Sequence, residues 1–178
     1  RTDPLDVGIL EEWFDAAHTD DDWQALSPGL AWEDHGLDYD GAAWYRRSLT
    51  LPEWEAVYLG LGSIDDEAEL WINGESVGQW APGTATLPMI HDLLTHGSPG
   101  DVINLALRIL DTGGYGGVKQ PIRIGAARKT VISPAQWMIR LAAAHPDWPM
   151  PGWTRGDPWA WTMAGAPEAD AEALFSRE

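Results

Sequence analysis

Short stretches in which every second residue is apolar recur through the middle of the chain, from about residue 28 to residue 125. Gly, Pro, Asp and Asn separate them, and the clearest are Val57-Leu59-Leu61, Ala68-Leu70-Ile72 and Ile103-Leu105-Leu107-Ile109. Alternation with a period of two is typical of antiparallel strands that bury one face and leave the other in water. The pattern therefore predicts an all-β fold made of half-buried antiparallel strands.

The turn residues support the same fold class. Asn73-Gly74 lies between two apolar stretches, and this dipeptide predicts a type I′ hairpin because both turn positions need a positive φ angle. Residues 118–125 and 129–142 are further strand candidates. Eight or so short strands in one domain favour an antiparallel β-sandwich of the jelly-roll kind.

The N-terminal region has a different pattern. Leu10, Trp13, Phe14 and Ala17 recur at helical spacing, which predicts a short helix near residues 9–17.

Trp71 departs from the strand pattern around it, because the alternation of Ala68, Leu70 and Ile72 places it on the opposite face of its strand. We therefore expect Trp71 to be exposed or covered by another part of the protein.

Length and charge limit the possible roles. The 178 residues suit one domain plus a tail. The net charge of −17 would repel phosphate backbones and anionic lipid surfaces, so neither nucleic acid nor a membrane is an expected partner. The chain has no cysteine, which excludes disulfides and thiolate chemistry. The lack of cysteine does not determine the cellular compartment, and we favour an extracellular or periplasmic location. Arg1 at the start of the sequence predicts a processed protein or an excised piece.

A series of motifs in residues 23–111 resembles the jelly-roll sugar-binding domain, a galactose-binding-like fold, of family 2 glycoside hydrolases. The opening motifs are Trp23, Ser27-Pro28-Gly29, residues 32–36 (WEDHG), Tyr39-Asp40-Gly41, residues 44–47 (WYRR) and Leu51-Pro52. Later landmarks follow in order, namely Leu59, Gly62, Asp65, Ala68, Trp71, Asn73-Gly74, Val77-Gly78, Pro88, Asp92, Asn104-Leu105 and Asp111. Residues 61–66 (LGSIDD) and 111–117 (DTGGYGG) are also similar to the β-sandwich domain of sialate O-acetylesterases.

Both resemblances imply a domain that is not catalytic and packs against a separate catalytic domain. We accordingly expect a carbohydrate-binding or accessory domain of a larger glycoside hydrolase or carbohydrate esterase, with a glycan or the catalytic domain of the same polypeptide as its partner. Two alternatives stay open: a purely structural sandwich between domains, and a free-standing small hydrolase. The expected organisation is a helical lead-in over 1–27, the sandwich over 28–142, a Trp/Pro-rich extension over 143–166 and a linker or tail helix over 167–178.

Two loops supply the candidate sugar-binding residues. Tryptophan and tyrosine rings stack on the apolar face of a pyranose, and carboxylates accept hydrogen bonds from its hydroxyls. The resemblance implies that the loops around residues 33–41 and 111–117 meet at one end of the sandwich. The candidates are Asp38, Tyr39, Asp40, Asp111 and Tyr115, with Trp80 as an accessory platform in a loop after the hairpin. The same aspartates could instead cap turns, and most of the twelve tryptophans could be core residues.

Metal and cofactor sites are not expected. Counted from Asp38, the twelfth position of an EF-hand would be Leu49 where a bidentate Glu is required, although another oxygen-lined calcium site stays possible. His91 and His96 are five apart, a spacing that does not place two imidazoles on one helix face, so zinc is disfavoured. With no thiol and no acid pair in a recognisable catalytic setting, we predict no catalytic residues in this chain.

Overall fold

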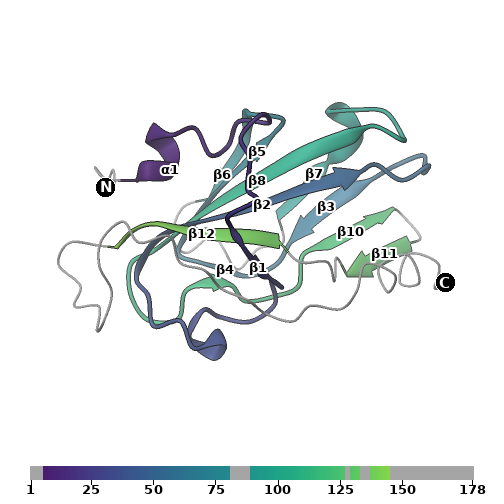
Figure 1. Cartoon of the computed structure of the whole chain (residues 1–178). Coiled ribbons are helices and arrows are strands. Elements are labelled where there is room, and N and C mark those ends of the chain that lie inside the picture. The colour runs from purple at the N-terminus through teal and green to yellow at the C-terminus, as the bar shows by residue number, and fades with distance from the viewer. Residues whose placement is uncertain (1–5, 81–88, 127–128, 133–136, 145–178) are drawn as a thin grey trace.

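The computed structural model describes residues 6–80, 89–126, 129–132 and 137–144, and these residues form antiparallel sheets packed as a β-sandwich (Figure 1). One sheet has six strands in the order β1 (Gln24–Leu26), β12 (Trp137–Ala144), β2 (Gly41–Thr50), β8 (Val102–Asp111), β5 (Glu67–Ile72) and β6 (Glu75–Trp80). A second has four, in the order β11 (Lys129–Ile132), β10 (Arg123–Ala126), β3 (Tyr58–Leu61) and β7 (Met89–Asp92). A small pair joins β4 (Ile64–Asp65) to β9 (Gly117–Val118). The all-β prediction is confirmed.

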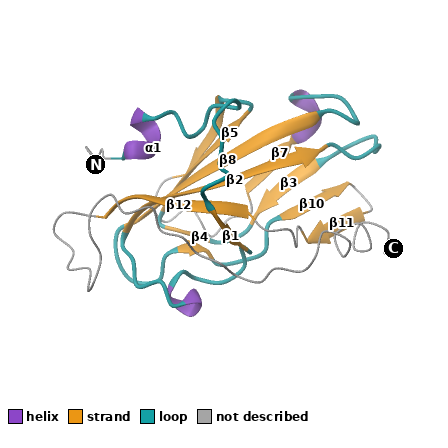
Figure 2. Ribbon diagram, in the orientation of Figure 1, coloured by secondary structure: helices purple, strands orange, loops and turns teal. Residues whose placement is uncertain are grey.

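Helical structure among the described residues is limited to short turns, as Figure 2 shows. They are α1 (Val7–Leu10) and the 3-10 turns η1 (Glu33–His35) and η2 (Leu93–Thr95). No helix of these residues is long and apolar enough to cross a membrane.

The main core lies between the two large sheets and follows the alternation of the sequence. Leu59, Leu70 and Leu107, from three different strands, are completely buried there. The hairpin at Asn73-Gly74 is also confirmed, because Ile72 pairs with Glu75 and both turn residues have positive φ, 52° and 85°. Local pattern therefore accounts for the strands that carry the core.

A second apolar cluster covers the outer face of the six-stranded sheet. Trp44 and Trp71 project from β2 and β5 onto this face, where the N-terminal segment places Trp13 and Phe14 against them. The ring of Phe14 stacks on Trp71 with centroids 5.5 Å apart, and Trp71 is only 5% exposed. Trp71 is thus covered by another part of the protein, which was one of the two outcomes expected.

Two buried charged residues fasten the N-terminal segment to this face. Arg46 of β2 donates hydrogen bonds to the backbone carbonyls of Trp13, Asp15 and His18, the last two at 3.0 Å. Asp6 forms an ion pair with Arg108 and accepts a hydrogen bond from Nε1 of Trp44 at 3.0 Å. Burying these charges is tolerable because each is paired or hydrogen-bonded.

The predicted helix near residues 9–17 is wrong in position and length. Helix α1 spans only Val7–Leu10, and Glu12 then takes a positive φ of 53°, which turns the chain away from the helix axis. The N–H of Trp13 still reaches the carbonyl of Gly8 at 2.8 Å. Packing of Trp13 and Phe14 on the sheet, together with the hydrogen bonds of Arg46, outweighs the helical spacing of the apolar residues.

The C-terminal half of the sandwich is divided more finely than the sequence predicts. The candidate strand 118–125 becomes β9 and β10, and the candidate 129–142 becomes β11 and β12. The lead-in also contributes to the sheet, since β1 pairs with β12 at Leu26 and Trp137. The tail proposed for 167–178, and the extension proposed for 143–166 beyond Ala144, lie outside the described residues.

Candidate functional site

The two candidate loops meet at one end of the six-stranded sheet. Strand β2 begins at Gly41 and pairs with β8, which ends at Asp111, and these two residues are register partners. The loop before β2 and the loop after β8 therefore emerge side by side. We call the group formed by Glu33, Asp38, Asp40, Asp66 and residues 111–117 the end-loop cluster.

Trp32 organises the end-loop cluster. This residue is fully buried, its N–H donates to the carbonyl of Gly116 at 3.0 Å and its indole N–H donates to the Tyr45 hydroxyl at 2.6 Å. A Cβ atom added to Gly116 would lie 2.5 Å from the Trp32 ring, so only glycine permits this approach. Glu33 accepts a hydrogen bond from the Gly116 N–H at 3.1 Å, and burial raises the pKa of Glu33.

Asp111 lies at the centre of the cluster and is completely buried. Its Oδ1 accepts a hydrogen bond from the Gly113 N–H at 3.1 Å. Burial raises the pKa of Asp111 to about 7, and the neighbouring carboxylates of Asp40 and Asp66 act in the same direction. Because a buried charge beside like charges is unfavourable, this carboxyl holds a proton at mildly acidic pH.

Asp66 connects the cluster to the neighbouring strands. Its carboxylate accepts hydrogen bonds from the backbone N–H of Thr112, at 2.9 Å, and from the Thr112 hydroxyl. Burial acts to raise the pKa of Asp66, but the hydrogen bonds from Thr112 outweigh it and lower the pKa overall. Asp65, the preceding residue, forms an ion pair with Lys119. These contacts hold the loop after β8 in place.

The structure divides the predicted sugar-binding residues into two groups. Asp38 is exposed, Asp40 is half-buried and Tyr115 is 59% exposed, so these three can reach a ligand. Tyr39 and Asp111 are buried, and Tyr39 donates its hydroxyl hydrogen to the carbonyl of Ala42 at 3.0 Å. In this conformation both side chains stabilise the loops from inside, and ligand contact by Tyr39 and Asp111 stays a prediction.

Trp80 is also placed differently from the expectation. It is the last residue of β6 rather than a loop residue, it is half-buried, and it packs partly against the main core. Its register partner is Ala68, which pairs in turn with Ile109 of β8. Trp80 therefore lies toward the same end of the sheet as Asp111, but two strands away, a lateral distance of about 10 Å.

Most of the described tryptophans are packing residues. Six of them are buried, namely Trp13, Trp23, Trp32, Trp44, Trp71 and Trp137, and Trp54 and Trp80 are half-buried. The remaining four, Trp148, Trp153, Trp159 and Trp161, lie outside the described residues. The high tryptophan content is therefore accounted for in large part by the two apolar clusters.

The structure also brings His91 and His96 into contact, which their spacing in the sequence did not predict. Their Nε2 atoms are 2.8 Å apart, because β7 and the end of η2 bring the two rings together without a helix. Burial and the charge of His96 lower the pKa of His91. Among the described residues, no group of three or more His, Asp or Glu side chains is arranged to hold a metal ion.

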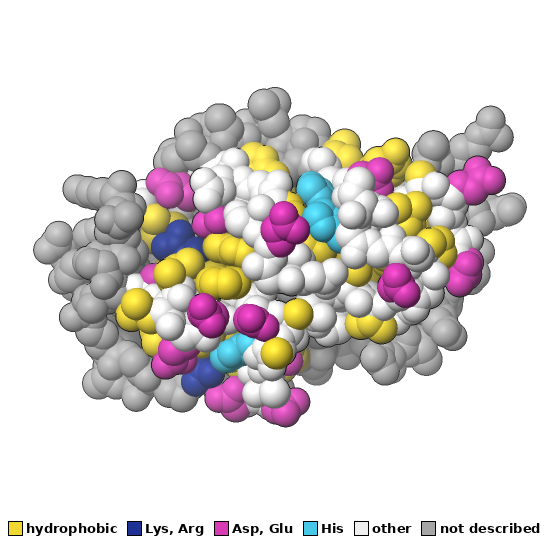
Figure 3. All heavy atoms as spheres, turned by 90° about the horizontal axis from the view of Figure 1, so that it is seen from above, with side chains coloured by type: hydrophobic (Ala, Val, Ile, Leu, Met, Phe, Trp, Pro, Cys, Tyr) yellow, Lys and Arg dark blue, Asp and Glu magenta, His cyan; other side chains and the backbone are white. Residues whose placement is uncertain are grey.

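The charge distribution agrees with the composition. Acidic side chains are scattered over the face seen in Figure 3, and Lys and Arg are few there. In the end-loop cluster, the exposed carboxylate of Asp38 can accept hydrogen bonds, and the exposed Tyr115 ring offers an apolar surface on the neighbouring loop. This combination can bind a neutral polyhydroxylated ring, since a carboxylate accepts hydrogen bonds from hydroxyl groups.

The chain is similar to known proteins in structure but not in sequence. The sequence matches no protein-family model, and it has no significant match among curated proteins. Beta-glucuronidase 2 of Bacteroides uniformis is similar to 67% of the chain, with a TM-score of 0.54 and 25% identity, but the match covers only 16% of that enzyme. Ruminococcus gnavus beta-glucuronidase, at 20% identity and a TM-score of 0.51, is similar in fold over 78% of the chain and 26% of its own length. These matches give no support to the resemblance to sialate O-acetylesterases. The chain is therefore related in structure to a domain of family 2 glycoside hydrolases.

Proposed function

We propose that this chain is a non-catalytic, carbohydrate-binding sandwich domain of a larger glycoside hydrolase, and that the end-loop cluster contacts the sugar. The observation that carries the proposal is the exposure of Asp38 and Tyr115 on the two loops that emerge side by side where Gly41 pairs with Asp111. The small share of each beta-glucuronidase that the chain covers supports an accessory role. The catalytic domain of the same polypeptide is the proposed protein partner.

The carboxylates favour a neutral sugar at this end. Burial raises the pKa of Glu33, and the negative charges of Asp40 and Asp38 raise it further. An anionic ligand would add to this repulsion between carboxylates. A ring stacked on Tyr115, with a few hydrogen bonds worth about 0.5–1.5 kcal/mol each, would bind only weakly. We expect dissociation constants from roughly millimolar to micromolar, or about 4–8 kcal/mol.

A second candidate function is a purely structural sandwich between domains. The burial of six described tryptophans favours it, because those rings serve packing instead of sugar stacking. Exposed apolar residues such as Leu30 and Val102 would then face a neighbouring domain. The two functions differ in whether the chain binds a glycan by itself.

Titration of the full 178-residue chain with neutral oligosaccharides, followed by amide NMR shifts, tests the proposal. Binding should shift the amides of residues 38–40 and 112–116, and Tyr115→Ala should abolish it without lowering the thermal midpoint. Val102→Ala, at the far end of β8, is the matched control and should bind normally. Absence of shifts at tens of millimolar sugar would replace the proposal by the structural function.

A further inference from the structure

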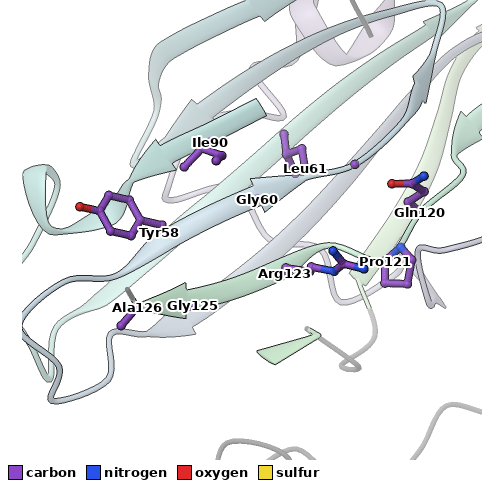
Figure 4. Close-up of a pocket in the computed structure, with 10 residues that line it drawn as sticks. Tyr58, Gly60, Leu61, Ile90, Gln120, Pro121, Arg123, Gly125 and Ala126 are labelled. Atoms are coloured by element: carbon purple, nitrogen blue, oxygen red, sulfur yellow. The ribbon is translucent and has the colours of Figure 1, made fainter. Parts of the chain in front are cut away.

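A recess lies on the outer face of the four-stranded sheet (Figure 4). Its cause is Gly60 of β3, which pairs with Ile90 of β7 on one side and with Arg123 of β10 on the other. Neighbouring strands are about 4.8 Å apart, so Ile90 and Arg123 stand about 10 Å apart with no side chain between them. A gap of this width accepts a flat six-membered ring.

Small residues form the floor of the recess and larger ones its rim. Gly60 and Gly125 contribute no side chain to the floor, and the Gln120 side chain lies over Gly62. The volume is about 290 Å³, close to the lower end of ligand pockets. In Figure 4, Tyr58 lies at one end and Gln120 and Pro121 at the other. The rim therefore offers apolar surface and hydrogen-bonding groups on the same side of the sheet.

Arg123 determines the charge of the recess. Among the described lining residues it is the one with a formal charge, and its side chain is exposed. It forms no ion pair with any residue in the described part of the chain, whereas Arg46, Arg108, Lys119 and Arg140 all do. In a chain of net charge −17, a guanidinium that has no ion-pair partner among the described residues favours a carboxylate ligand, which it can bind through two parallel hydrogen bonds.

We propose that this recess is a second ligand site, which binds one sugar-sized ring that carries a carboxylate. Arg123 holds the carboxylate, Gln120 at the same end of the recess bonds the ring hydroxyls, and the apolar side chain of Ile90 faces the C–H side of the ring. The site is distinct from the end-loop cluster, because none of the residues that line the recess belongs to that cluster.

The test compares methyl glucuronide with methyl glucoside, which differ only in the carboxylate. The uronide should shift the amides of residues 58–62, 90–92 and 123–126 with a dissociation constant in the millimolar range, and the glucoside should bind there at least about tenfold more weakly. Arg123→Gln should reduce affinity for the uronide by about tenfold or more. It should leave any binding of neutral sugar at the end-loop cluster unchanged.

A side chain introduced at Gly60 would fill the recess, and this variant tests for loss of ligand binding in a protein that still folds. A Cβ at Gly60 would meet only Arg123 atoms, at 3.7 and 3.8 Å, which is ordinary contact, so Gly60→Val should fold normally and abolish uronide binding. Thr50→Val, an exposed position on β2, is the control and should bind normally.

Three outcomes would overturn the site: equal affinity for both methyl glycosides, unchanged binding in Gly60→Val, or no shifts at these amides with tens of millimolar uronide. Loss of uronide binding in Tyr115→Ala instead would assign the ligand to the end-loop cluster. Because the two sites are tested with different sugars and different variants, the failure of one proposal is distinguishable from the failure of the other.

Discussion

Replacing Asp111 by Asn should remove a large part of the pH dependence of stability. In the folded protein burial raises the pKa of Asp111 to about 7, against 3.8 for an ordinary Asp in the unfolded chain. The folded state therefore binds this proton more tightly than the unfolded state does. Stability is highest when Asp111 is protonated, and it falls as the pH rises from about 4 to about 7.

The size of the effect follows from the shift of roughly three pKa units. At 1.36 kcal/mol per unit, ionising Asp111 costs at most about 4 kcal/mol of folding free energy by pH 8. Asn keeps the shape of the protonated carboxyl and cannot ionise. Asp111→Asn should consequently match the unmodified chain in stability only near pH 4, and its advantage should grow with pH to about 1–4 kcal/mol at pH 8.

Urea unfolding followed by tryptophan fluorescence at pH 5, 6, 7 and 8 measures this difference. Asp38→Asn is the matched control, because it removes the same charge from an exposed position in the same cluster. It separates the effect of Asp111 from the general repulsion of a chain with net charge −17. If Asp111→Asn and Asp38→Asn change stability equally at every pH, or if Asp111→Asn is the less stable at pH 8, the assignment of a buried protonated carboxyl is refuted.

Three further predictions concern packing. Trp71→Ala should lower the free energy of unfolding by about 3–5 kcal/mol, because it removes the ring on which Phe14 stacks; a loss below about 1 kcal/mol in urea unfolding would contradict this. Arg46→Met leaves three backbone carbonyls without their donor, so hydrogen exchange should show lost protection over residues 13–18 while β8 stays protected. Gly116→Ala should destabilise by about 1–3 kcal/mol, since its Cβ would meet the Trp32 ring at 2.5 Å, and an unchanged thermal midpoint would show that the loop can move aside.

Local patterns in the sequence were sufficient for the fold class. The alternation in residues 57–61, 67–72 and 103–109 predicts which side chains enter the core, because side-chain direction in a strand depends only on parity. The Asn73-Gly74 turn is equally local, since the two residues themselves provide the positive φ angles. Strand parity also puts Trp71 on the face away from the core.

Tertiary structure decided what covers that face and where ligands can bind. Nothing in the spacing of Trp13 and Phe14 distinguishes a helix from a segment that packs on a distant sheet, which is why the helix predicted near residues 9–17 is wrong. The burial of Tyr39 and Asp111 depends on how the loops pack around Trp32, a contact between residues far apart in the sequence.

The recess at Gly60 exists only because three strands align in one register, with Ile90 and Arg123 on either side of a residue that has no side chain. From the sequence alone, a single glycine in a strand does not predict a recess. Strand parity is a property of neighbouring residues and is readable from sequence, whereas burial, proton affinity and pocket shape are sums over residues that only folding brings together.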